Sequence, residues 1–174
     1  MADNYLEKKM EEYRSGKSAA GKFSRKPSQG YFALKMSGLR ILLAGAVTPE
    51  ADVCIRKLAA SGCKVAFYDR NRGAGYAQLS GALYIPTDDL DEAFTQAAAR
   101  WGSIDVVLLT VSIETRIVEM LRASGVNRVI GLGVEFTSGL CDVTIALGYE
   151  DEAVANLCAV LCHPSTYCLR NILL

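Results

Sequence analysis

The order of apolar and amphipathic segments predicts an α/β fold, a doubly wound parallel sheet in three layers. Unbroken apolar runs, typical of strands buried on both faces, alternate with amphipathic segments of helical length. The first run ends at Gly45 and the second at Asp69, with a helical segment between them. Strand, tight turn, helix and strand with a terminal acid is the order of a dinucleotide-binding βαβ unit, so the sequence predicts a Rossmann-like domain.

Each element follows from its local pattern. Short apolar runs predict strands at 40–44, 64–69, 82–85, 104–109 and 128–132. The segment 167–173 is strand-like, and 142–147 suits either a strand or a loop. Helical periodicity predicts helices at 49–61, 76–79, 91–100, 114–123 and 150–161. Pro49 is tolerated in a first helical turn, whereas Asp89 and Gly102 are expected to cap and stop their helix.

Residues 1–38 are predicted to form an N-terminal helical arm and linker, and residues 39–174 the Rossmann-like domain. Leu6, Met10 and Tyr13 fall on one face of a helix expected at 4–14. A helix of about three turns is marginal alone and needs a packing partner. Because a Gly- and Ser-rich segment follows it, the sequence favours a homo-oligomer, a dimer joined by this arm. Packing of the helix on its own domain is the alternative.

Composition narrows the class of protein. The chain has 174 residues, enough for one domain with a proper core, and no net charge. Residues 1–38 hold eight basic and four acidic side chains, too weak an excess for the basic face that nucleic-acid binding usually needs. No apolar run approaches the roughly 18 residues of a membrane span. The polar N-terminus lacks a secretion signal, which favours a cytoplasmic protein whose six cysteines are buried thiols.

The turn after the first predicted strand is where a dinucleotide fold places phosphate, against backbone N–H groups and a positive helix end. Against a Gly-x-x-Gly-x-x-Gly template Gly45 matches, while Thr48 and Ala51 occupy the other two places. The acid Glu50 would compete there with an anion. The predicted cofactor-binding residues of this turn are Gly45, Ala46, Val47 and Thr48. The alternative is a capped helix start in a fold without its ligand.

Asp69 ends the second predicted strand, where an acid would accept a hydrogen bond from a ribose 2′-hydroxyl. This favours NAD over NADP. Arg70 and Arg72 follow directly and would instead favour a 2′-phosphate. An ordinary acid in a solvated turn is the alternative to both.

The stretch from Leu39 to Asp105 resembles the short-chain dehydrogenase/reductase family. "KLAASGCKVAFYDRN" looks like the family's first helix and second strand, and "GALYIPTDDLDEAFTQAAARWGSIDVVL" is closer still. Asp88 falls at the family's adenine-contacting acid, and "RASGVNRVIGL" is similar to atypical members. The resemblance extends to about Leu161 and implies NAD or NADP as cofactor.

The chain departs from the family's catalytic pattern. The segment Leu109–Ser112 replaces the family's Asn-Asn-Ala-Gly, and Thr110 in it is a further predicted cofactor contact. The family's chemistry needs a Tyr activated by a Lys four residues later. Where this motif belongs, Tyr149 is the only candidate, and Ala153 stands in place of the lysine. The chain also ends before the region where family members usually build a substrate pocket.

Cys158, Cys162 and His163 are the remaining candidate ligands, with Cys168 beyond them. Their spacing matches no common zinc pattern, and cysteine is often a small buried hydrophobe. The sequence therefore predicts no metal site.

Together these observations predict a degenerate short-chain dehydrogenase-like protein that binds NAD(P) weakly at most. The alternatives are an NAD(P)-dependent oxidoreductase with non-standard residues and a non-catalytic structural or regulatory subunit.

Overall fold

The computed structural model describes residues 36–133, 141–145, 151–167 and 172–173. The strands are β1 (Arg40–Ala44), β2 (Lys64–Phe67), β3 (Leu83–Tyr84), β4 (Val106–Leu109), β5 (Arg128–Leu132), β6 (Val143–Ile145) and β7 (Ile172–Leu173). The helices are α2 (Pro49–Ala60), α3 (Gly73–Ser80), α4 (Leu90–Trp101), α5 (Thr115–Ala123), α6 (Asp151–Cys162) and the 3-10 helix η1 (Pro164–Thr166).

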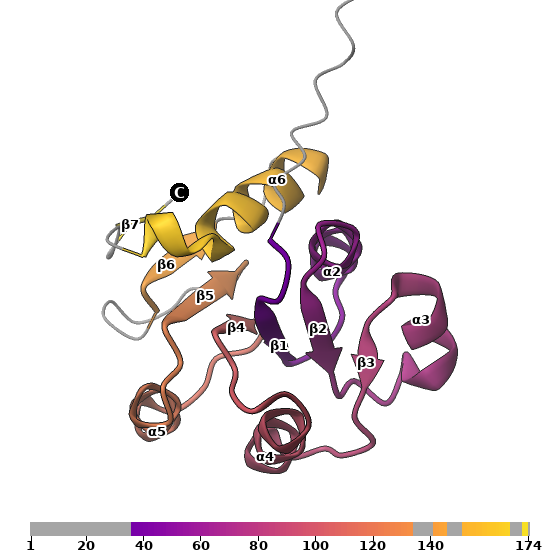
Figure 1. Ribbon diagram of the computed structural model, residues 1–174, viewed down its shortest axis with the longest axis horizontal. Coiled ribbons are helices and arrows are strands. Elements are labelled where there is room, and N and C mark those ends of the chain that lie inside the picture. The colour runs from indigo at the N-terminus through magenta and orange to yellow at the C-terminus, as the bar shows by residue number, and fades with distance from the viewer. Residues whose placement is uncertain (1–35, 134–140, 146–150, 168–171, 174) are drawn as a thin grey trace, which may run out of the picture. The chain divides into compact units, whose positions relative to one another are not determined.

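The strands form one parallel sheet in the order β3-β2-β1-β4-β5-β6-β7. Ile41 at the centre lies opposite Val65 on one side and Val106 on the other. Helices α2 and α6 cover one face of the sheet and α4 and α5 the other (Figure 1). The predicted doubly wound three-layer fold is confirmed. In such a sheet, ligands bind where the strand order reverses, at the carboxyl ends of β1 and β4.

The core divides into two clusters because successive strand residues point to opposite faces. In β1, Ile41 and Leu43 pack in the cluster under α2 and α6, while Leu42 and Ala44 pack in the cluster under α4 and α5. All four are fully buried, which explains why the strand reads as an unbroken apolar run. Each buried Leu or Ile contributes about 1.5–3 kcal/mol.

The opposite edge of the sheet, at the amino ends of the strands, is held by two arginines. The Arg40 guanidinium bonds both carboxylate oxygens of Asp105 through Nε (2.8 Å) and Nη2 (2.7 Å). Arg128 is 1% exposed and donates to the carbonyls of Leu161 and Thr166, which fixes the end of α6. These contacts stabilise the amino ends of the strands. The candidate site lies at the opposite, carboxyl ends.

Most predicted boundaries are confirmed within two residues, but those of α3 and β7 were wrong, and β2 ends two residues early. Helix α3 is longer than the predicted 76–79, because buried Tyr76 anchors it and packing overrides the low helix propensity of its glycines. Strand β2 stops at Phe67, since the chain turns away before Asp69. Strand β7 begins at Ile172, because Tyr167 instead closes the η1 turn. The predicted arm helix at 4–14 lies outside the described residues.

Candidate functional site

Residues that follow β1, β2 and β3 come together at the carboxyl edge of the sheet. They line a hollow of about 270 Å³ beside Gly45. Its lining residues are Gly45, Ala46, Tyr68, Asp69, Arg70, Asn71 and Asp88. Five predicted cofactor contacts are thus gathered here, namely Gly45, Ala46, Asp69, Arg70 and Asp88. Val47, Thr48 and Thr110 lie in the neighbouring turns and are not among the lining residues.

The carboxylate of Asp69 joins the turn after β2 to the turn after β1. Its Oδ2 accepts a hydrogen bond from the Val47 backbone N–H at 2.8 Å, and its Oδ1 accepts one from the Asn71 N–H at 2.9 Å. Each oxygen retains a lone pair, so a ribose hydroxyl has an acceptor here. The Val47 N–H, however, already donates to protein.

The start of α2 offers few donors to an anion. Pro49 has no N–H, and the N–H groups of Ala51 and Asp52 bond to the Thr48 hydroxyl (3.3 Å) and carbonyl (2.9 Å). Thr48 therefore caps α2, as the alternative interpretation of this turn expects. Glu50 keeps the only uncommitted N–H of this first turn in the described structure, and its carboxylate opposes a negative ligand, whereas that of Asp52 is paired with Arg56 at 2.8 Å.

The crevice between β1 and β4 is closed over Gly45. The Thr110 hydroxyl donates to the Ala46 carbonyl at 2.8 Å, and the Thr110 N–H donates to the Ala44 carbonyl at 3.0 Å. Gly45 has φ +114°, and a Cβ there would lie 2.3 Å from Val111 Cγ1. Only glycine fits both the backbone conformation and this close approach.

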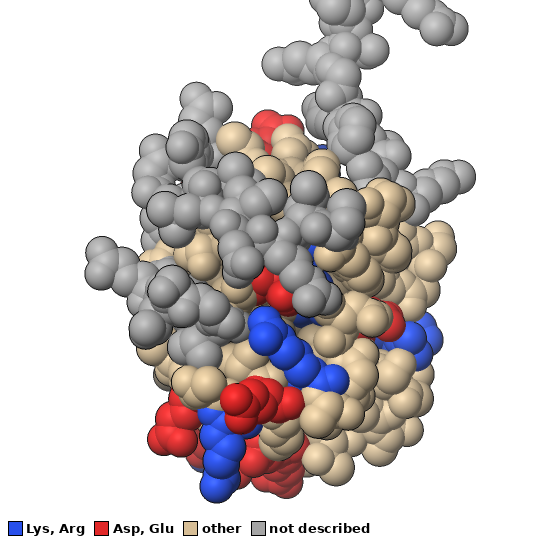
Figure 2. All heavy atoms as spheres, turned by 90° about the vertical axis from the view of Figure 1, so that its left-hand side faces the viewer, with Lys and Arg blue, Asp and Glu red and all other residues tan. Residues whose placement is uncertain are grey.

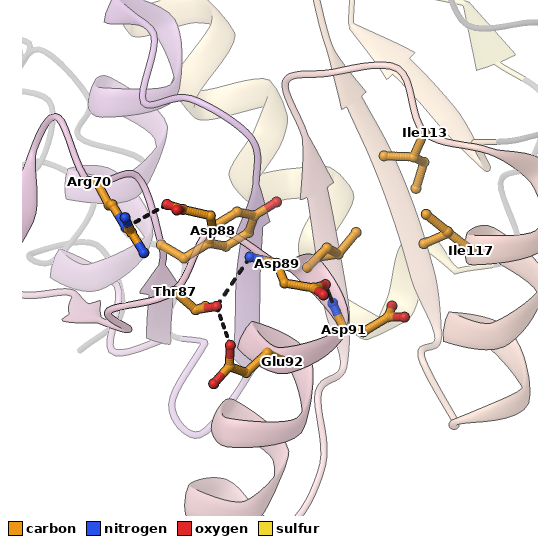
Figure 3. A pocket seen from close by; sticks show the side chains of 10 residues that line it. Arg70, Thr87, Asp88, Asp89, Asp91, Glu92, Ile113 and Ile117 are labelled. Carbon is orange, nitrogen blue, oxygen red and sulfur yellow. Dashed lines mark hydrogen bonds and ion pairs between the residues drawn. The ribbon is translucent and has the colours of Figure 1, made fainter.

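A second, larger hollow of about 580 Å³ opens on the other side of Arg70 and Asp88. Ile113 and Ile117 form its apolar side, opposite the acidic segment Asp88–Glu92 (Figure 3). Thr87 orders that segment by donating to Glu92 at 2.6 Å and accepting from the Asp89 N–H at 3.2 Å. An ion pair from Arg70 Nε to Asp88 Oδ1, 2.6 Å long, lies between the two hollows.

Tyr68 is shared by both hollows and presents an aromatic ring to them. Its pKa is raised, chiefly by burial and further by Asp89, while a hydrogen bond with the Gly45 backbone acts in the opposite direction. The phenol is therefore neutral at physiological pH, and its ring is a surface for a planar base.

Comparisons with models of known protein families and with curated protein sequences find no match. Solved structures do match. A short-chain dehydrogenase/reductase from Serratia marcescens aligns with a TM-score of 0.60 at 16% identity, covering 80% of this chain and 96% of that one. A hydroxysteroid dehydrogenase from Escherichia coli gives 0.61 at 11% identity, covering 83% and 96%. An enoyl-(acyl-carrier-protein) reductase from Anaplasma phagocytophilum in complex with NAD gives 0.60 at 14% identity, covering 82% and 93%.

This chain shares the Rossmann-like fold of these solved structures. At these identities the likeness establishes the fold alone. Within this fold the described residues fit the adenosine half of NAD, since a hollow with an acid and an aromatic ring is present. They fit the diphosphate poorly, because the turn from Gly45 to Asp52 is short of donors and carries two acids.

The sequence-based catalytic candidate falls outside the described residues. Tyr149 and the segment 134–140, which follows β5, are both in this position. The sequence itself carries Tyr-x-x-x-Lys only at Tyr5, Tyr13 and Tyr31, all before β1. Tyr149 therefore stays a sequence-based candidate.

Sequence reasoning missed several lining residues of the larger hollow, namely Tyr68, Thr87, Ile113 and Ile117. A signal was available for three of them. Ile113 and Ile117 are four residues apart across the start of α5, so they share one side of it. The signal for Tyr68 was its place directly before Asp69 at a strand end.

The five cysteines among the described residues pack in the core. Cys54 on α2 and Cys158 on α6 are in thiol contact, and Cys158 also contacts Cys162. His163 caps η1, where its Nδ1 accepts from the Ser165 N–H at 3.2 Å. In the described part of the chain no three His, Cys, Asp or Glu side chains are arranged to hold a metal ion.

Basic and acidic side chains lie side by side on the described surface. Figure 2 shows Lys and Arg side chains lying beside Asp and Glu on the face that it presents. None of the described helices combines the length and apolar character of a membrane span.

Proposed function

We propose that this chain is a degenerate short-chain dehydrogenase-like protein that binds NAD weakly through its adenosine half. The observation that carries the proposal is the Asp69 carboxylate, which bonds the Val47 N–H and still faces the hollow beside Gly45. The site thus offers an acceptor to a ribose hydroxyl. The Val47 N–H, in the turn where the fold would place phosphate, already donates to the protein.

The adenosine half has partners in this hollow. Asp69 would accept from the ribose hydroxyls, and Asp88 would accept from the adenine amino group, as the family resemblance implies. The Tyr68 ring would lie beside the base. These contacts support recognition of a nucleoside more than of its phosphates.

Weak affinity follows from the diphosphate end. A phosphate near α2 would find one uncommitted N–H at Glu50 and the carboxylate of Glu50, while Asp52 is paired with Arg56. Acids in a first helical turn interact unfavourably with an anion that the helix dipole would otherwise attract.

Loss of ordinary reductase chemistry is the second part of the proposal. The family's proton transfer depends on a Tyr whose pKa is lowered by a Lys, and this pair is missing from the sequence after β1. The bound nucleotide would then serve assembly or sensing instead of hydride transfer.

Isothermal titration calorimetry with three probes tests this function. NAD⁺ and ADP-ribose share the adenosine diphosphate half, whereas nicotinamide mononucleotide lacks it. We expect NAD⁺ and ADP-ribose to bind with similar, weak affinity and the mononucleotide to bind less. Equal binding of the mononucleotide, or no binding of ADP-ribose, would contradict the proposal.

We also propose that the arm at residues 1–38 joins two copies of the chain. The support is sequence-based, the apolar stripe of Leu6, Met10 and Tyr13. Light scattering should find a dimer that Met10→Glu dissociates and that Lys8→Glu, off the stripe, leaves intact. A monomeric wild type would refute this.

A further inference from the structure

The two hollows at the carboxyl edge are divided by one ion pair. Arg70 Nε and Asp88 Oδ1 are 2.6 Å apart, and both residues line both hollows. Figure 3 shows the Arg70 side chain reaching across to Asp88 from the neighbouring strand end. The cation that directly follows the ribose acceptor Asp69 in the chain is thus already paired with a protein carboxylate.

The next cation along the chain is committed elsewhere. Arg72 Nη2 donates to the Val47 carbonyl at 3.4 Å, and its guanidinium lies 5.6 Å from the centre of the Tyr76 ring. Arg72 is also not among the residues that line either hollow. Arg70 is therefore the arginine that a phosphate on the ribose would have to recruit.

We propose that Asp88 is a selectivity residue, which masks Arg70 so that the site accepts a free ribose 2′-hydroxyl and disfavours a 2′-phosphate. The inference rests on the proposed function and names the nucleotide class that it takes.

The physical reason is the local charge. A 2′-phosphate carries a charge of about −1.5 to −2 and would meet the carboxylates of Asp69 and Asp88 with one guanidinium between them. Without the Asp88 charge, Arg70 is free to donate two parallel hydrogen bonds to phosphate. Because the Arg70 and Asp88 side chains are 63% and 64% exposed, water screens the pair and the expected change is moderate.

The test compares NAD⁺ and NADP⁺ binding by calorimetry in four proteins: wild type, Asp88→Asn, the double variant Arg70→Gln/Asp88→Asn, and Asp89→Asn. Asn at 88 keeps an acceptor but removes the charge. Asp89→Asn is the matched control, because it removes a neighbouring charge that does not contact Arg70, and Asn also caps a helix.

We expect wild type to prefer NAD⁺. Asp88→Asn should raise the affinity for NADP⁺ relative to that for NAD⁺ at least threefold. The double variant should lose this gain, and Asp89→Asn should keep the wild-type ratio. An unchanged ratio in Asp88→Asn, or an equal change in Asp89→Asn, with NAD⁺ still bound, would overturn the inference alone. Failure of all four proteins to bind either nucleotide would overturn the proposed function and the inference with it.

Discussion

Asp69 accepts a hydrogen bond from the Val47 backbone N–H, although the two residues are 22 positions apart. The carboxylate, which lies just beyond β2, thereby holds the turn after β1 in place. We expect Asp69→Ala to lower the free energy of unfolding by about 2 kcal/mol, because a hydrogen bond to a charged group is lost. Asp69→Asn, which keeps an acceptor oxygen, should lose less. Urea denaturation measures both, and equal losses would argue against the bond to Val47.

Gly45 is expected to tolerate no side chain. Gly45→Ala should cost about 3 kcal/mol, since its positive φ strains any other residue and a Cβ would lie 2.3 Å from Val111 Cγ1. Gly125→Ala is the control for the backbone term alone, because Gly125 also has a positive φ (+87°) but open space around it. Denaturation midpoints should rank the two variants in this order. Adding Val111→Ala should recover part of the loss at Gly45, and no recovery would refute the close approach.

Glu50 should weaken nucleotide binding. Glu50→Gln removes a carboxylate from the first turn of α2, and we expect NAD⁺ affinity to rise about twofold to fivefold, as removal of an unfavourable charge–dipole interaction allows. Glu119→Gln, at an exposed position of α5, is the matched control and should leave the NAD⁺ affinity unchanged. Calorimetry at low salt measures both, and unchanged affinity in Glu50→Gln would show that phosphate does not approach this helix end.

Asp105 should make stability depend on pH. Burial alone would raise the pKa of its carboxyl, but hydrogen bonds and charge from Arg40 outweigh this and lower it. The unfolded chain then binds more protons than the folded one as the pH falls below about 5. The contribution of the pair is therefore complete above that pH and is lost as the pH falls through the folded pKa.

The measurement is urea unfolding between pH 6 and pH 3 for wild type and Asp105→Asn. We expect wild type to lose more stability over this interval, since the variant has no carboxyl at this position. Parallel curves would mean that Arg40 does not stabilise the ionised form.

The described thiols should resist modification. Cys54, Cys63, Cys141, Cys158 and Cys162 are all buried. Burial raises the pKa of Cys63 to about 11, and burial together with Asp142 raises that of Cys141 to about 12, so little thiolate forms. We expect Cys168→Ser protein to react with a thiol reagent only at its unfolding rate. Rapid labelling of the native variant would contradict the buried cluster.

Sequence alone predicted the architecture because buried parallel strands leave an unbroken apolar signature. The bounds of β1 and β5 are those predicted, and both strands are buried along most or all of their length. Short peripheral elements such as α3 were less predictable, because their limits depend on packing of Tyr76 and on its hydroxyl bond to Asp52.

The sequence indicates where the candidate site lies, but not which partners its charged side chains contact. Five of the eight predicted cofactor contacts line the hollow beside Gly45, since the carboxyl ends of parallel strands meet at one edge. In the sequence, Asp69 and Arg70 have opposite implications for the ribose. The choice depends on which partners the side chains find, Val47 for Asp69 and Asp88 for Arg70, and these contacts join different turns.

The most direct test of the central claim is a titration of NAD⁺ followed in ¹H–¹⁵N NMR spectra, which gives both the affinity and the location of binding. The proposal expects saturable shifts of the Gly45, Asn71 and Asp88 amides, with a dissociation constant on the order of 1 mM. An absence of shifts at these residues at several times that concentration would contradict it, as would shifts confined to another edge of the sheet.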